Sequence, residues 1–174
     1  DASVLKSLKA KVAELKLQAT KGGAIQLRQV NVLQSKLASF AESDEVKNLI
    51  LGMLKEHLAK GREEIRKRFD AGADGAHVVR ENCYLIDQIV RTLFDLATTH
   101  VYPVANPTSA DRLCLVAIGG YGRGELAPHS DVDLLFLMPY KQTPRGEQVA
   151  EYILYLLWDL GLKVGHAVRS VDEC

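Results

Sequence analysis

Apolar residues in the first hundred positions recur at three- and four-residue spacing, the period of an amphipathic helix. The pattern predicts helices over residues 4–15 and 24–40 and a third helix that begins near Ser43. A fourth helix is expected to end near Tyr102, because Pro103 disfavours helical geometry in the residue before it. Residues 1–103 are therefore predicted to form a helical region. The buried stripe of the third helix is expected to comprise Val46, Leu49, Ile50, Met53, Leu54 and Leu58.

Gly61 is expected to interrupt the third helix without clearly ending it, and in residues 62–68 acidic and basic side chains are mixed at helical spacing. We interpret this run as a solvent-facing helix surface and assign no chemistry to it.

The periodicity changes after the proline-containing linker of residues 104–111. Two short apolar runs, at 113–118 and 132–138, are typical of buried strands. A helix is predicted over 147–160 and a third strand over 162–169. The chain is thus expected to be an α+β protein, with a second domain over residues 111–174.

Composition narrows the functional classes. The 22 Lys and Arg balance the 22 Asp and Glu, so no global positive field attracts nucleic acid or an anionic membrane, and neither partner is expected. The longest apolar stretch, around 134–138, is far shorter than the roughly 20 residues that span a bilayer. Three widely spaced cysteines, Cys83, Cys114 and Cys174, fit reduced thiols of a cytoplasmic protein. Because the first residue is Asp1, we expect a piece of a longer protein.

Two acidic residues stand at the head of the second apolar run. Asp131 and Asp133 are two positions apart, so in a strand their side chains project from one face while Val132 points into the core. Their oxygen atoms suit Mg²⁺, which takes one or two carboxylates and completes its coordination with water and substrate phosphates. We predict that both aspartates are catalytic metal ligands.

A glycine-rich turn supplies the complementary half of this site. Without side chains, its backbone N–H groups can approach phosphate oxygens, and a helix starting near Tyr121 would direct its positive end at the same anion. The letters match neither a dinucleotide fingerprint nor a P-loop. The simpler alternative is a tight turn followed by aspartates that cap a loop. We favour the phosphate-binding interpretation for Gly119, Gly120, Gly122 and Gly124.

Other polar residues near the turn carry weaker signals. Ser130 is predicted to orient a carboxylate or contact phosphate, and Arg123 either donates to a phosphate or pairs with Glu125. His129, next to the aspartates, and His166, on the third predicted strand, are candidates for a catalytic or substrate-binding role, although a surface or satisfied core position is the default. Together with the glycine turn, the pattern predicts a magnesium-dependent nucleotidyltransferase.

The string from Ala117 to Leu135, AIGGYGRGELAPHSDVDLL, resembles the nucleotidyltransferase motif of the bacterial PII uridylyltransferase family. Residues 152–170 and 61–65 are similar to the same family, and the match extends over roughly 55–174. The family has Gly-Gly at the turn, as this chain does, whereas the wider superfamily commonly has Gly-Ser.

The resemblance implies a polymerase-β-like domain, a mixed sheet with flanking helices, that is truncated at its C-terminal end. It also implies transfer of UMP from UTP to a tyrosine of the signalling protein PII, with Mg²⁺ held by Asp131 and Asp133. Family members are much longer and continue into a domain that removes UMP hydrolytically and domains that sense glutamine. An ATP-using relative or a catalytically degenerate regulatory module are the alternatives.

A third carboxylate is usual in this superfamily. The candidates here are Asp172 and Glu173, but they are more typical of acids that begin the next helix, where they complement its dipole. The chain as given is therefore expected to be a weak transferase.

Overall fold

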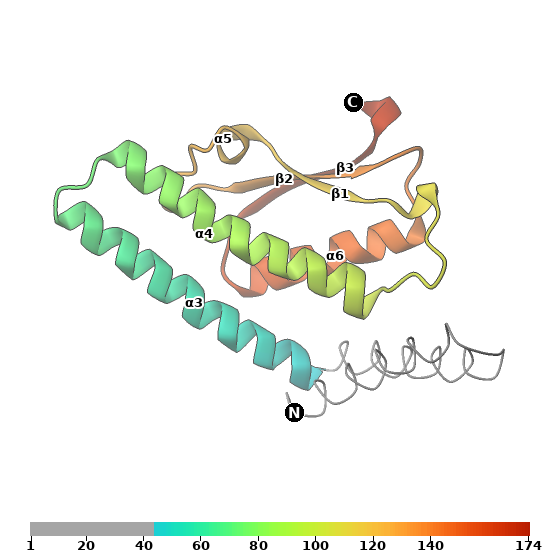
Figure 1. The fold of residues 1–174 in the computed structure, drawn as a ribbon, viewed down its shortest axis with the longest axis horizontal. Coiled ribbons are helices and arrows are strands. Elements are labelled where there is room, and N and C mark those ends of the chain that lie inside the picture. Colours follow the sequence, from blue (N-terminus) through green and yellow to red (C-terminus); the bar gives the residue numbers. More distant parts are fainter. Residues whose placement is uncertain (1–43) are drawn as a thin grey trace, which may run out of the picture.

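The computed structural model describes residues 44–174, so the helices predicted over 4–15 and 24–40 lie outside the described residues. Two long antiparallel helices, α3 (Asp44–Asp70) and α4 (Gly75–Leu96), form a hairpin, and α4 continues as a π-helical turn, Ala97–Val101 (Figure 1). The helical segment thus ends just before Tyr102, as predicted. Gly61 does not interrupt α3: a Cβ there would lie 2.6 Å from Leu85 Cδ1, so glycine lets the two helices pack closely.

The predicted stripe of α3 is partly wrong. Val46 and Leu58 are buried, but Leu49 and Met53 are 47% and 55% exposed. Among the described elements α3 packs mainly against α4, and a helix with one neighbour buries a narrower stripe than a helix that faces a whole core. The buried positions of α3 are Val46, Leu51, Leu58 and Ile65.

A three-stranded sheet follows the helices, in the order β1-β2-β3. Strand β1 (Cys114–Ala117) pairs antiparallel with β2 (Val132–Met138), and β2 pairs parallel with β3 (Val164–Ser170). Helix α6 (Pro144–Asp159) makes the crossover from β2 to β3, as parallel pairing requires. The expected α+β fold with a mixed sheet and flanking helices is confirmed.

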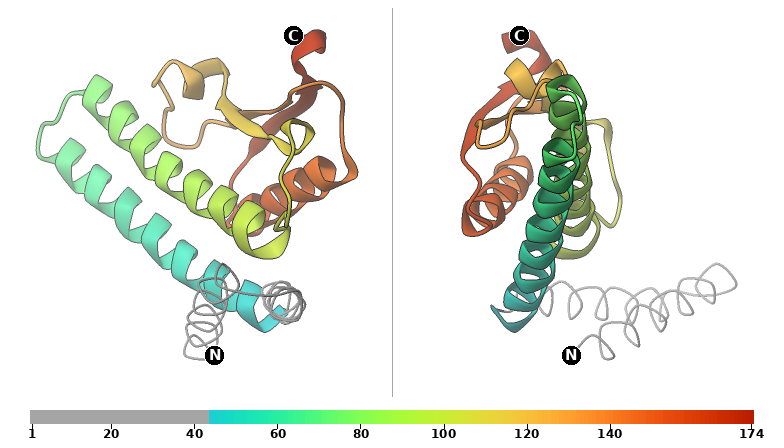
Figure 2. Two further views of the ribbon diagram at one scale, coloured as in Figure 1. Left: turned by 45° about the vertical axis from the view of Figure 1, so that its right-hand side comes forward. Right: turned by 90° about the vertical axis from the view of Figure 1, so that its left-hand side faces the viewer.

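The two faces of this sheet differ in what covers them. Alternate residues of β2 are buried on the face that α6 covers, whereas the residues between them are half-buried on the opposite face. Figure 2 shows the helices gathered on one side of the sheet. The apolar run 132–138 was expected to be a buried strand, but among the described residues only one of its faces is covered by helices. The fully covered positions are Val132, Leu134, Phe136 and Met138.

Helix α6 begins three residues earlier than predicted. The Thr143 hydroxyl accepts a hydrogen bond from the Gly146 amide at 3.1 Å, and Pro144 occupies the first helical position, where its missing N–H has no cost. This Thr-Pro start was a readable signal that the apolar period alone does not include. A side chain at Gly146 would meet Met138, so glycine also allows α6 to pack closely on β2.

Arg145, in the first turn of α6, connects this helix to the linker and to the end of the helical segment that continues α4. Its guanidinium donates to the carbonyl oxygens of Tyr102 at 2.9 Å, Asp111 at 3.1 Å and Thr98 at 3.3 Å. The apolar side chains of α4, the sheet and α6 belong to one continuous core. The shared core and the hydrogen bonds of Arg145 therefore fix the position and the orientation of the sheet relative to α4. In the described part of the chain, no helix is long and apolar enough to cross a membrane.

Candidate functional site

The side chain of Asp133 is held between two glycines at the start of β2. A Cβ at Gly119 would lie 2.6 Å from Asp133 Oδ2, and a Cβ at Gly165, its partner on β3, would meet Oδ1. Gly119 also adopts φ +60°, a conformation that strongly favours glycine. The half-buried carboxylate therefore fits its place only because both neighbours lack side chains.

The glycine turn is a single helical turn, α5 (Gly119–Gly122), at the end of β1. The Ile118 amide donates to the Asp133 carbonyl at 3.0 Å, which fixes this turn beside the head of β2. A Cβ at Gly122 would lie 2.5 Å from the Ala117 carbonyl oxygen, so the turn folds tightly over β1. Because the first amides of a helical turn have no intrahelical acceptor, Gly119 and Gly120 direct N–H groups away from the turn. The predicted helix start near Tyr121 is thus present, two residues earlier.

The remaining predicted residues lie in the loop that joins α5 to β2. Asp131 and Ser130 are exposed and precede the first residue of the strand, so the same-face argument from strand geometry applies to Asp133 and not to Asp131. Arg123 Nε donates to Glu125 Oε2 at 3.0 Å, and both side chains are largely exposed. Of the two alternatives for Arg123, the structure shows the pairing with Glu125.

The two candidate histidines lie on different sides of the molecule. His166 is in register with the buried Leu134, and its ring packs edge-on against Trp158 of α6 at 6.1 Å between centroids. His166 therefore shares the helix-covered face, away from Asp133. His129 has φ +69°, rare for a residue with a side chain, and it lies in the loop two positions before Asp131.

Helix α4 anchors the glycine turn through polar side chains that the sequence analysis did not single out. Tyr121 is buried, and its hydroxyl donates to Asp87 Oδ1 at 2.5 Å. Burial, reinforced by this hydrogen bond, raises the pKa of Tyr121 well above its usual range. The available signal was two polar residues, Asn82 and Asp87, within the apolar stripe of a helix.

The loop after α5 is anchored in the same way. Asn82 Nδ2 donates to the Leu126 carbonyl at 2.9 Å, and the Leu126 amide donates to Cys83 Sγ at 3.3 Å. Both side chains of α4 are buried, and Leu126 is 2% exposed. Through these bonds α4 sets the path of the chain that leads to Asp131 and Asp133. Cys83 is a free thiol, as are Cys114 and Cys174.

Neither candidate for a third carboxylate joins the two aspartates. Glu173 accepts hydrogen bonds from the Ser170 amide at 2.7 Å and the Ser170 hydroxyl at 2.9 Å, and caps a 3₁₀ turn, Val171–Glu173. These bonds lower the pKa of Glu173. This agrees with the expectation that the two acids begin the next helical element. Within residues 44–174, no group of three His, Cys, Asp or Glu side chains is arranged to hold a metal.

A glycine turn, an aspartate seated between glycines and a mixed sheet backed by helices together define a nucleotidyltransferase domain. The model of the nucleotidyltransferase domain family matches residues 111–173. The chain is 57% identical over 142 residues to the bifunctional uridylyltransferase/uridylyl-removing enzyme of Azospirillum brasilense. It is 55% identical over 144 residues to the enzyme of the same name from Rhodospirillum rubrum.

These matches cover 82% of the chain, and the chain therefore belongs to the family of bifunctional uridylyltransferase/uridylyl-removing enzymes. The chain spans about 15% of the length of these relatives. No solved structure matches it.

Proposed function

We propose that this chain carries the transferase site of a PII uridylyltransferase, which moves UMP from UTP to a tyrosine hydroxyl of PII and releases pyrophosphate. Membership of the family supports the transfer of a uridylyl group. The single observation that carries the proposal is the carboxylate of Asp133, seated between Gly119 and Gly165 beside the glycine turn. At both positions the atom nearest to an added Cβ would be a carboxylate oxygen of Asp133, so glycine at these contacts leaves room for that side chain.

The residues present fit a magnesium ion. Asp133 and Asp131 offer hard oxygen ligands, and Mg²⁺ takes one or two carboxylates together with substrate phosphates. When bound, the metal activates the attacking hydroxyl and neutralises the leaving pyrophosphate. The amide N–H groups of Gly119 and Gly120 would donate hydrogen bonds to phosphate oxygens, and α4 keeps the turn and the loop in position through Asp87 and Asn82.

In the transfer, the tyrosine oxygen bonds to the α-phosphorus of UTP while the bond to the bridging oxygen breaks. The chain's own contribution is to hold the triphosphate against the turn, so that attack and departure lie in line. Among residues 44–174, no third His, Cys, Asp or Glu side chain joins Asp131 and Asp133 in a metal-binding group.

The test of base preference compares UTP with ATP. We expect Mg²⁺-dependent binding of UTP, and transfer of labelled UMP to purified PII, with ATP a much poorer substrate. Equal or better use of ATP would assign the chain to an adenylyl-transferring relative. Absence of binding to either nucleotide would favour a degenerate regulatory module.

We expect transfer by residues 1–174 alone to be weak. Without a third carboxylate the acceptor hydroxyl has no positioned base, and loss of general-base catalysis costs on the order of 10²-fold or more in rate. The measurement compares UMP transfer to PII by this chain and by a protein extended to the length of its relatives. Equal rates would show that the catalytic set is complete within residues 1–174.

We expect the protein to be cytoplasmic. We assign UMP removal and glutamine sensing to the parts of the relatives that lie beyond the matched region. This chain is expected to release no UMP from modified PII in a purified reaction. Release by the chain alone would reveal a hydrolytic site within it.

A further inference from the structure

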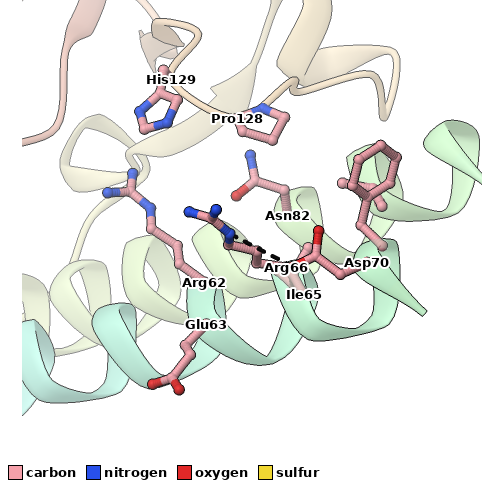
Figure 3. A pocket seen from close by; sticks show the side chains of 10 residues that line it. Arg62, Glu63, Ile65, Arg66, Asp70, Asn82, Pro128 and His129 are labelled. Atoms are coloured by element: carbon pink, nitrogen blue, oxygen red, sulfur yellow. Dashed lines mark ion pairs between the residues drawn. The ribbon is translucent and has the colours of Figure 1, made fainter. Parts of the chain in front are cut away.

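A cavity of about 580 Å³ lies between α3, α4 and the loop that leads to Asp131. Its size is within the range of pockets that bind small ligands or the side chains of a peptide. Its floor is apolar, formed by Ile65 and Phe69 of α3 and Val78 of α4. Its polar residues come from α3, α4 and the loop. Figure 3 shows Arg62 and Arg66 of α3 extending toward His129 of the loop.

The cavity is lined by two arginines, Arg62 and Arg66, and two acids, Glu63 and Asp70. Because Glu63 is paired with Lys67 at the edge of the cavity, three basic side chains balance two acidic ones here. No ion pair or hydrogen bond joins the Arg62 side chain to another residue of the described part of the chain, and Arg66 Nε lies 3.7 Å from Asp70 Oδ2. Glu63, the other acid at the cavity, is paired with Lys67 at 2.8 Å. The exposed Arg66–Asp70 pair contributes little to stability. Both arginines therefore remain available to an anionic partner. Two arginines beside an apolar floor suit a ligand that carries both carboxylates and an apolar or aromatic side chain.

The cavity also lies next to the transferase site. His129, whose left-handed backbone places its ring at the cavity, is two positions before Asp131 and follows Pro128, another residue of the cavity wall. An occupant is thus held beside the loop that carries Asp131 and leads into Asp133 of β2. The triphosphate of the nucleotide already has a complementary surface at the glycine turn. The cavity therefore remains for the other substrate, the acceptor.

We propose that this cavity docks an acidic, tyrosine-bearing segment of the protein acceptor, with Arg62 and Arg66 binding its carboxylates. The proposal rests on the proposed function, because it assigns the acceptor of that same site. It gives a role to two arginines in a charged run that otherwise reads as a solvent-facing helix surface.

The direct test measures binding of a fluorescent copolymer of glutamate and tyrosine to the 174-residue chain by anisotropy. We expect the double variant Arg62→Ala/Arg66→Ala to bind about tenfold or more weakly, and the salt dependence of its affinity to be reduced. Arg62→Lys/Arg66→Lys keeps the charge and should recover part of the affinity. The matched control, Lys55→Ala/Lys60→Ala, removes the same charge from exposed positions of α3 away from the cavity and should bind as the unmodified chain does.

Equal affinity of the arginine and lysine variants would overturn the proposal. A second outcome would also overturn it: the arginine variant loses affinity for Mg·UTP, and Mg·UTP displaces the copolymer from the unmodified chain. The anion bound in the cavity would then be the nucleotide.

A kinetic arm separates this inference from the proposed function. In the protein extended to the length of its relatives, Arg62→Ala/Arg66→Ala should raise the KM for PII about tenfold, with little change in the KM for UTP. The docking site would be rejected if the unmodified protein transfers UMP and the variant has an unchanged KM for PII. The proposed transferase function would still stand in that case. Failure of the unmodified protein to modify PII would reject the proposed acceptor, whereas the copolymer assay would still report on the cavity.

Discussion

The two faces of strand β2 serve different purposes. On the face that α6 covers, Leu134 and Phe136 are almost completely buried among apolar side chains. On the opposite face, Asp133 is bordered by glycines, and Leu135 is only half-buried. The first face fills space with large side chains, whereas the second leaves space by omitting them. Burial on one face is expected to supply most of the stability, whereas the proposed function assigns nucleotide chemistry to the other face of the same seven-residue strand.

Phe136→Ala gives the largest expected effect and tests the covered face. Removal of a fully buried aromatic ring should lower the free energy of unfolding by about 3–5 kcal/mol. Urea unfolding measures the change, with Leu135→Ala on the half-buried face as the control. If the control costs as much as Phe136→Ala, the two faces are equally important for stability and the comparison fails.

Asp133→Asn tests the other face. The substitution keeps the shape of the side chain but removes its charge, so we expect metal-dependent binding of UTP to be abolished and transfer to fall by on the order of 10²–10³-fold. Asp131→Asn should behave in the same way. The melting temperature should not change in either variant. Unchanged Mg·UTP affinity in both would remove the aspartates from the site.

Gly165→Ala asks whether the glycines position the carboxylate. The added methyl group would meet Asp133 Oδ1, so we expect Mg·UTP affinity to fall by roughly 10–100-fold, as when a group that orients a metal ligand is lost. Gly52→Ala is the matched control, since its Cβ would meet nothing within 4 Å in the middle of α3. The control should stabilise the chain by about 0.5–1 kcal/mol and leave binding unchanged. Equal affinity of the two variants would argue against positioning by Gly165.

Tyr121→Phe has the smallest expected effect and tests the link between α4 and the glycine turn. Loss of the hydrogen bond to Asp87 should lower the free energy of unfolding by about 1.5 kcal/mol at neutral pH. The raised pKa of Tyr121 means that the folded chain keeps the proton at a pH where the unfolded chain releases it. This contribution is therefore complete below the ordinary tyrosine pKa of 10.0 and declines above it.

The difference in stability between Tyr121→Phe and the unmodified chain should accordingly shrink as the pH rises above about 10. Unfolding curves at several pH values measure it. A difference that stays constant with pH would contradict a proton held by the buried hydroxyl.

Much of the fold was predictable because its signals are local. The helical period of α4, the apolar runs of β1 and β2, and the turn of Gly119 and Gly120 followed by Asp133 are all carried by neighbouring residues. The resemblance to a known family likewise depended on one continuous string. Local letters also contained the start of α6 at Thr143, although the apolar period alone missed it.

By itself, the sequence determined the order of helices and strands, the glycine turn and the aspartates beside it, because these depend on residues close together along the chain. Only the tertiary structure decided which face of β2 is covered, since an apolar run does not reveal what packs on it. It also decided that Gly165 borders Asp133 and that Asn82 and Asp87 hold the turn, because strand register and helix packing bring together residues that are distant in sequence. The cavity beneath His129 arises in the same way, from three separate segments whose side chains converge only in the folded chain.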